Sequence, residues 1–334
     1  MTTVNPEVRH PASSAALLLD RSDRVRLEVS GPDRAKFLHN LTTNDVKRLV
    51  AGQGAETFVT SLQGKTLGLM ILLAGDDRIL VLTDPGGAEH LAPHLAKYGV
   101  FDDVAILDVG PRTFEFHVFG VQAEEALRQS GAELPEAGDL RHLVTTSGGR
   151  PVRLSRESSF GFPGYTLIGD RADVDAVRGA ILDGGAVPIN DESAEPLRIE
   201  AGTPMFGRDV SVENLPQEVG RDARAINFVK GCYLGQETVA RIDARGHVNR
   251  HLRGLILDAG SENPPLPGAA VESEGKIVGV VTSAAYSPRR GCVVALGYVR
   301  TAQSKPETAV VLVAGTERWP AIVSDLPMNA SATV

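Results

Sequence analysis

The sequence predicts an α+β fold of three packed units: two mixed units followed by a small β-barrel. The 334-residue chain is too long for one small core. The order β-α-β-β-β-α is indicated twice, in two consecutive segments of similar length. Short apolar runs separated by Gly, Pro and Ser then follow, as in a small antiparallel barrel or sandwich. We expect the units at residues 14–110, 111–248 and 249–328.

The first unit is expected to begin with a strand over Arg24–Ser30, where polar and apolar residues alternate. Pro32 suits the first position of the helix that follows. Ala88–Tyr98 also has a helical pattern, although Pro93 should delay its start or kink it. The other strands of this unit are predicted at Glu56–Ser61, Lys65–Leu73 and Arg78–Thr83.

The second unit repeats this order. Its last helix, Ala172–Asp183, is amphipathic, and a further helix over Asp191–Ala201 has Asn190 as a side-chain cap. Between Thr203 and Ile226 the sequence is polar and irregular. The remaining elements are a strand at Thr113–Phe119, a helix at Glu124–Gln129, and strands at Arg141–Thr146, Pro151–Arg156 and Gly164–Ile168.

The third unit begins after a junction near Arg245–His251. Its apolar runs have the length of short strands, and turn residues separate them. These runs are Leu255–Leu257, Ala270–Val271, Ile277–Thr282, Cys292–Val299 and Val310–Val313.

Composition excludes several classes of protein. The net charge of −8 argues against a nucleic-acid or anionic-membrane binder, and apolar runs such as Leu67–Ala74 are too short to span a bilayer. We therefore expect a cytoplasmic protein. Two cysteines, Cys232 and Cys292, exclude a disulfide framework and supply too few thiolates for a resident zinc or iron–sulfur site. His247 and His251 have helical metal spacing but no matching acid or cysteine, so no metal site is predicted.

The most informative stretch surrounds Cys232. It reads Lys230-Gly231-Cys232-Tyr233-Leu234-Gly235-Gln236-Glu237. The two glycines permit a sharp bend, and the lysine charge, with a helix beginning near Gly235, would favour the thiolate. A cysteine can also be a small buried hydrophobe. Its neighbours favour a functional thiol, with Lys230, Gln236 and Glu237 as the groups that act with it.

This run resembles the K-G-C-Y/F-x-G-Q-E signature of the YgfZ family, which lies within the glycine-cleavage T-protein superfamily. Arg24–Val46, Leu197–Gly202 and the stretch from Leu252 resemble further segments of that superfamily. The resemblance implies three domains in a ring around a central cavity that holds tetrahydrofolate or a one-carbon derivative. It also implies support of iron–sulfur cluster assembly or repair, with Cys232 as the working thiol and iron–sulfur enzymes or assembly factors as partners.

The resemblance also implies which residues bind folate. Glu200, in the segment Arg198-Ile199-Glu200-Ala201-Gly202, is expected to accept hydrogen bonds from the pterin, whose neighbouring N–H groups suit a carboxylate. Residues two apart do not share a helix face, so we expect Glu200 rather than Arg198 to face the cavity. Asn44 and Tyr233, on the other matching segments, complete the expected folate-binding set together with Arg198.

One departure bears on catalysis. T-proteins carry a Gly-Gly-x-x-Asp-Asp pattern whose aspartate is assigned to the transfer chemistry, but here Gly68 and Leu69 occupy the two acidic positions. A general acid–base group contributes about 10²–10⁴-fold, so aminomethyl transfer is disfavoured. It remains the main alternative function, with Asp45 as the nearest replacement acid. A non-catalytic scaffold without a ligand is the second alternative.

A basic stretch follows the cysteine run. Arginines at 241, 245, 250 and 253 face only one acid, Asp243, in an otherwise acidic protein. Arginine suits carboxylates, so Arg245 and Arg250 are expected to receive the polyglutamate tail of cellular folate. Surface charges paired with nearby acids are the alternative.

Overall fold

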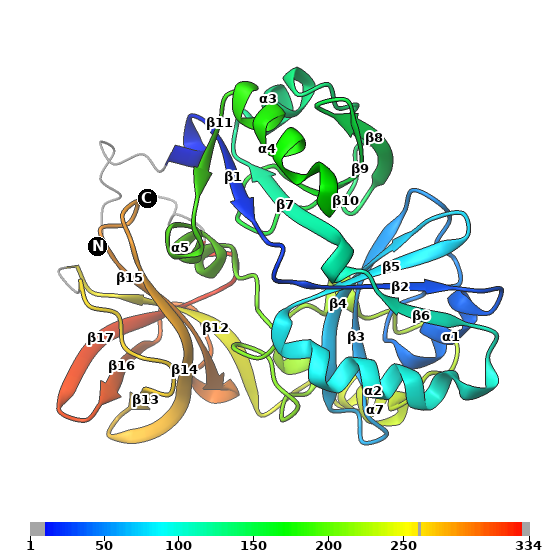
Figure 1. Ribbon diagram of the computed structural model, residues 1–334. Helices are drawn as coiled ribbons and strands as arrows, with labels where there is room; N and C mark the ends of the chain where they lie inside the picture. The colour runs from blue at the N-terminus through cyan, green and yellow to red at the C-terminus, as the bar shows by residue number, and fades with distance from the viewer. Residues whose placement is uncertain (1–10, 260–261, 329–334) are drawn as a thin grey trace.

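Two mixed sheets and a closed barrel make up the protein in a computed structural model that describes residues 11–259 and 262–328. The three units surround a common centre (Figure 1). The predicted α+β architecture with a C-terminal barrel is therefore confirmed.

The first sheet has the strand order β3-β4-β5-β2-β6. Helices α1 (Arg34–Leu41) and α2 (Ala88–Tyr98) pack on it through Phe37 and Leu95, which belong to its apolar core. α2 begins at Ala88 and contains Pro93, so the expected late start is not observed. The strands are β2 (Val25–Ser30), β3 (Gly54–Thr60), β4 (Thr66–Ala74), β5 (Arg78–Thr83) and β6 (Ala105–Asp108).

The second sheet has the order β11-β1-β7-β10-β9-β8, and α3 (Ala123–Gln129) and α4 (Val174–Asp183) cover it. The strands are β1 (Ala16–Asp20), β7 (Thr113–Phe119), β8 (His142–Ser147), β9 (Arg150–Arg156), β10 (Gly164–Asp170) and β11 (Ala186–Ile189). No strand was predicted at β1, and its residues fall within the expected first unit. It lies here instead because its four buried residues pair with β7 on one side and β11 on the other.

The segment after β11 joins all three units. α5 (Asp191–Ala201) begins at Asn190, whose Oδ1 accepts the Ser193 N–H at 3.0 Å, as predicted, and packs against the barrel. The irregular stretch that follows contains the short helix α6 (Asp222–Ala225), and α7 (Gln236–Arg245) begins after Gly235. The short 3₁₀ turns are Pro11–Ser13, Pro85–Gly87, Gly99–Phe101, Gly110–Arg112, Arg171–Asp173, Pro216–Glu218 and Thr301–Gln303.

The C-terminal barrel closes through the pairing of β12 with β17. Its own core includes Leu255, Val293 and Leu312, all completely or almost completely buried. No helix of the described residues is long and apolar enough to cross a membrane. The strands are β12 (Arg250–Leu257), β13 (Ala270–Ser273), β14 (Lys276–Ser287), β15 (Cys292–Arg300), β16 (Ala309–Ala314) and β17 (Glu317–Ser324).

Candidate functional site

A central cavity of about 380 Å³ lies where the three units meet. The first sheet contributes Glu56 and Leu69–Ile71, and the segment 157–161 comes from the second unit. Leu326 and Pro327, just after the last barrel strand, complete the wall. A volume of this size suits a small organic ligand. The other lining residues are Arg21, Arg24, Asp84, Arg198, Ala201, Thr203, Pro204, Met205, Gly220, Arg221, Ala223 and Arg224.

Glu56 is held by two arginines on one side of this cavity. Arg221 donates from Nε to Oε1 at 2.7 Å and from Nη2 to Oε2 at 2.5 Å. Arg224 Nε donates to the same Oε2 at 3.2 Å. Such charge-assisted, two-pronged pairing fixes the direction of the carboxylate.

A second group of charges lines the cavity from the other unit. Burial alone would raise the pKa of Glu157, but the nearby positive charges, Arg24 first, hold it at about 2. Its Oε2 accepts the Thr166 hydroxyl at 2.7 Å, and Arg21 lies 3.9 Å from Oε1. Asp84 accepts the Phe206 N–H at 3.0 Å. Both carboxylates are therefore held in place by the protein itself.

The hydrogen-bond donors and acceptors that line the cavity suit a pterin-bearing ligand. Arg24 Nε is buried and has no hydrogen-bond acceptor among the described residues, although Asp84 lies 3.6 Å away. Phe160 supplies an aromatic ring and Met205 an adaptable apolar surface. Carboxylates can accept from amino and amide N–H groups, while arginines can bind a ligand carboxylate.

Leu69 lines this cavity. It pairs with Phe58 across the β3–β4 ladder, and Glu56 stands on the same face one step further along β3. The position at which related proteins are expected to carry an aspartate therefore faces the cavity, but here it presents a hydrocarbon side chain. Gly68 lies on the opposite face of β4.

Glu200 was predicted to face the cavity, but it is not among the lining residues. Its carboxylate accepts the Ser287 hydroxyl at 2.5 Å and pairs with Arg289 and Arg290, all from the barrel side. Arg198 lines the cavity instead, although its guanidinium is bound to Asp209 and Glu195. Only one of Arg198 and Glu200 lines the cavity. That residue is Arg198, whereas the prediction was Glu200. The pairing with Arg289 and Arg290 holds the Glu200 carboxylate at the barrel, away from the cavity.

Cys232 is exposed and is not a lining residue of the cavity. The cysteine run packs at the far end of β3, where Thr60 donates to the Leu234 carbonyl at 2.5 Å. Thr60 lies four positions along β3 from Glu56, or roughly 13 Å away. The thiol is therefore exposed on the first unit and does not face the central cavity.

Lys230 is committed to the backbone rather than to the thiol. Its ammonium donates to the carbonyls of His39, Thr42 and Asn44 at 2.6, 2.5 and 2.8 Å, around the end of α1. Burial lowers the pKa of Lys230 to about 7, while these three acceptors favour the charged form. All three ammonium protons have backbone acceptors, so this lysine fixes the run to α1.

The remaining residues of the cysteine run either stabilise its turn or lie exposed. Gln236 Oε1 accepts the Tyr233 N–H at 3.1 Å, and the Tyr233 ring lies 4.8 Å from the Lys230 ammonium. Glu237 is exposed in the first turn of α7. Asn44 donates to the carbonyls of Glu56 and Arg224 and so supports one wall of the cavity from behind.

The basic stretch does not converge on the cavity. Arg245 is exposed at the end of α7, and Arg250 pairs with Glu218 at 3.1 Å and lies over the Tyr298 ring. Neither residue lines the cavity. Within the described residues, no group of three or more His, Cys, Asp or Glu side chains is placed to hold a metal ion.

Several cavity residues were not identified from sequence. They are Glu56, Asp84, Glu157 and the arginines Arg21, Arg24, Arg221 and Arg224. One signal was available: Glu56 is a charged residue within a predicted buried strand. The arginines carry no such signal, because isolated arginines in loops usually face solvent.

Comparison with known proteins places the chain in a family. The signature "GCVT N-terminal domain" matches residues 1–230, and "Glycine cleavage T-protein C-terminal barrel domain" matches residues 250–329. The fold resembles aminomethyltransferase T from Bartonella henselae, with a TM-score of 0.85 at 21% identity, over 95% of this chain and 87% of that one.

Three curated relatives align with this chain over most of its length and most of their own. A chloroplastic protein of Arabidopsis thaliana, named only as a candidate transferase, is 30% identical over 95% of this chain and 72% of its own length. An aminomethyltransferase of Streptomyces avermitilis is 28% identical over 89% and 82%. The tRNA-modifying protein YgfZ of Colwellia psychrerythraea is 29% identical over 74% and 73%. The chain belongs to the glycine-cleavage T-protein family.

Proposed function

We propose that this protein binds a tetrahydrofolate in the central cavity and supports assembly or repair of iron–sulfur clusters through Cys232, without aminomethyl transfer. The proposal rests on one observation: the central cavity is present, but Leu69 stands on its wall. A side chain that cannot move a proton stands where the transfer reaction would need an acid.

The cavity residues bind and orient in this proposal. Glu56, Asp84 and Glu157 are acceptors for the ring amino and amide groups of folate, and Arg24 offers its Nε, which lacks a hydrogen-bond acceptor among the described residues. Arginines on the same wall suit the carboxylates of its glutamate portion. The folate, when bound, supplies a carrier for one-carbon units.

Cys232 acts at a distance from this cavity. Its exposure allows another protein to reach the thiol, and Lys230, Gln236 and Gly235 hold the turn on which it stands. A transient contact with a cluster, or thiol exchange with a client enzyme, takes place on the outer surface of the first unit. In either case the cluster is cargo and not a resident group.

Titration calorimetry with tetrahydrofolate tests the binding half of the proposal. Wild type should give saturable heat, and Glu56→Gln should weaken the affinity by at least about tenfold, because a charge-assisted acceptor is lost. Glu89→Gln, which changes an exposed acid on α2, is the matched control and should bind as wild type does. Absence of heat in wild type would favour a scaffold without ligand.

Genetic rescue tests the cysteine half. Cys232→Ala should fail to restore iron–sulfur enzyme activities in a host that lacks its own relative of this protein. The same variant should retain wild-type heat with tetrahydrofolate, because Cys232 does not line the cavity. Full rescue by the alanine variant would remove Cys232 from the mechanism while leaving the folate result intact.

Aminomethyl transfer is the second candidate function. It is favoured by the names of several relatives and by the carboxylate of Glu56 on the same sheet face as Leu69. Asp45, the acid expected from the sequence, is not among the cavity residues and contacts His39 and Arg48 instead. A turnover assay with an aminomethylated carrier protein distinguishes the two functions. Turnover that Glu56→Gln abolishes would establish transfer.

A further inference from the structure

A second cavity, of about 310 Å³, lies at the junction of the two sheets. It shares no lining residue with the central cavity. The first unit contributes parts of β2, β4 and β5, and the second contributes the start of β7 with β9 and β10. The lining residues are Glu28, Leu73, Arg78, Leu80, Val109, Arg112, Thr113, Arg153, Ile168, Gly169 and Asp170.

The floor of this second cavity is apolar and fixed. Leu73, Leu80, Val109 and Ile168 all belong to one buried cluster that joins the two units. None of the four exceeds 9% exposure. The floor is therefore part of the packed interface between the sheets, and it offers a preformed hydrocarbon surface to anything above it.

Three arginines surround this floor, and two of them lack a counter-charge. Arg78 pairs with Glu28 at 2.9 Å and with Asp77 at 2.7 Å. Arg112 and Arg153, in contrast, have no carboxylate within 4.0 Å among the described residues. Two guanidinium groups at one cavity are therefore without a direct carboxylate partner.

Arg153 is the more informative of the two. It is half-buried on β9 beside Ile168, and its Nη1 donates to Nδ1 of His142 at 2.9 Å. The other ring nitrogen of His142 lies 3.2 Å from the Gln53 carbonyl, so that nitrogen carries the proton and the ring is neutral. Burial, and then the charge of Arg78, lower the pKa of Arg153. The guanidinium is thus held in place without an anion.

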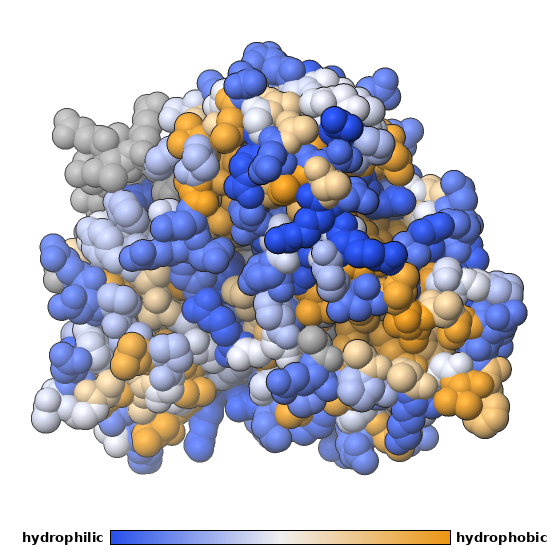
Figure 2. All heavy atoms as spheres, in the orientation of Figure 1, coloured by the Kyte–Doolittle hydropathy of each residue, from blue (hydrophilic) through white to orange (hydrophobic). Residues whose placement is uncertain are grey.

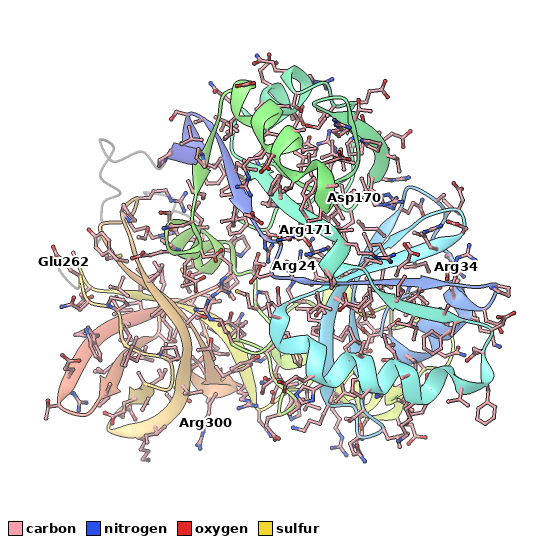
Figure 3. All side chains as sticks on the ribbon, viewed as in Figure 1. Arg24, Arg34, Asp170, Arg171, Glu262 and Arg300 are labelled. Atoms are coloured by element: carbon pink, nitrogen blue, oxygen red, sulfur yellow. The ribbon has the colours of Figure 1, made fainter. Side chains whose placement is uncertain are left out.

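The acids around this cavity are already engaged or more distant. Glu28 and Asp77 both pair with Arg78, and Asp170 Oδ1 accepts the Ala172 N–H at 2.8 Å. Asp76, Asp77 and Glu28 all act on Arg153, but only at longer range, because no ion pair joins any of them to it. Figure 3 places Asp170 and Arg171 at the end of β10, and Figure 2 shows strongly hydrophilic side chains gathered over this junction.

We propose that this second cavity binds a phosphate monoester with a small apolar body. A phosphate monoester carries about −1.5 to −2 charge near neutral pH, which suits two guanidinium groups that have no carboxylate within 4.0 Å among the described residues. Arginine forks suit phosphate oxygens, and the leucine, valine and isoleucine floor suits the attached hydrocarbon. The ligand bridges the two units, since Arg112 and Arg153 stand on the second and the floor comes from both.

The test uses phenyl phosphate with the full chain in titration calorimetry. We expect saturable binding by wild type and weaker binding of inorganic phosphate, which cannot use the floor. Arg112→Gln and Arg153→Gln should each lower the affinity by at least about tenfold, the loss of one charge-assisted contact. Arg171→Gln is the matched control, because Arg171 is exposed nearby but does not line this cavity.

Three outcomes would overturn the proposal. They are absence of saturable binding in wild type, equal affinity for inorganic and phenyl phosphate, or wild-type affinity in Arg112→Gln. The last variant removes an exposed side chain without an ion pair among the described residues, so its fold should persist even if Arg153→Gln unfolds. Heat with tetrahydrofolate, measured on the same variants, separates failure of this site from failure of the central one.

Discussion

Arg221 donates to both carboxylate oxygens of Glu56, at 2.7 and 2.5 Å, across 165 residues of sequence. Glu56 stands on β3 of the first sheet, whereas Arg221 lies in the irregular stretch before α6. The pair thus ties that stretch to the sheet and sets one wall of the central cavity. Because both side chains are largely buried, the pair is a structural requirement as well as a binding feature.

Arg221→Ala should destabilise the protein by about 3 kcal/mol, at the lower end for a broken buried pair, because Arg224 still contacts Glu56. Denaturant unfolding measures this loss. Arg245→Ala, on the exposed end of α7, is the matched control and should leave stability within about 0.5 kcal/mol of wild type. An equal, small effect for both variants would show that the Glu56 pair contributes little.

Glu200→Gln should affect stability more than folate binding. The carboxylate is buried and pairs with Arg289 and Arg290, so its loss leaves two arginines facing a neutral amide. We expect a loss of about 3 kcal/mol in the free energy of unfolding. Tetrahydrofolate affinity of the folded variant should be unchanged, since Glu200 does not line the cavity. A large loss of affinity with normal stability would restore the pterin contact expected from the sequence.

Local patterns predicted most elements of this fold. Thr113–Phe119 and Asp191–Ala201 were predicted with the bounds that the structure has, because clear periodicity, or a cap such as Asn190, marks their ends. The strands β1, β6, β11 and β17 were missed. β6 and β11 have only four residues, too few for a period to show, and each depends on partners distant in the sequence.

The direction of a side chain at the site was harder to predict than the element that carries it. Both Arg198 and Glu200 reach barrel strand β14, at Ser283 and Ser287, but only Arg198 lines the cavity, and their spacing on α5 does not indicate which of them does so. Rotation of the helix depends on the barrel arginines, 89 and 90 residues later. The same holds for Lys230, whose three carbonyl acceptors come from the end of α1 and could not be inferred from the residues around Cys232.

Asp222→Asn should stabilise the protein at neutral pH. Burial, and then the charge of Asp243, raise the pKa of Asp222 to about 6, and its Oδ1 has no hydrogen-bond donor among the described residues. Between about pH 4 and 6 the folded state holds a proton that the unfolded state has released, so stability falls as pH rises through this window. Asparagine removes the charge and therefore this loss.

Melting temperatures at about pH 4 and pH 7 test this prediction. The gain from Asp222→Asn should be larger at pH 7, where the wild-type carboxylate is ionised in both states. Asp243→Asn, which removes only the second cause, should give a smaller gain with the same pH dependence. A gain that is equal at both pH values would exclude ionisation of Asp222 as its source.

Gly235 should be intolerant of any side chain, because it fixes the cysteine run against the first sheet. Its φ is 82°, and an added Cβ would overlap the Ser61 carbonyl oxygen. Gly246, at the other end of the same helix, has a φ of 71° but open space around it. Alanine at 246 should cost about 1 kcal/mol for its left-handed backbone alone, and alanine at 235 clearly more.

The two variants also separate backbone strain from displacement of the thiol. The reaction rate of Cys232 with a disulfide reagent should change in Gly235→Ala, because the overlap must move the turn away from Ser61. It should stay at the wild-type value in Gly246→Ala, since nothing there has to move. Equal rates in both variants, with a larger stability loss at 235, would mean that the hairpin at residues 61–65 yields instead. The position of Cys232 would then not depend on this contact.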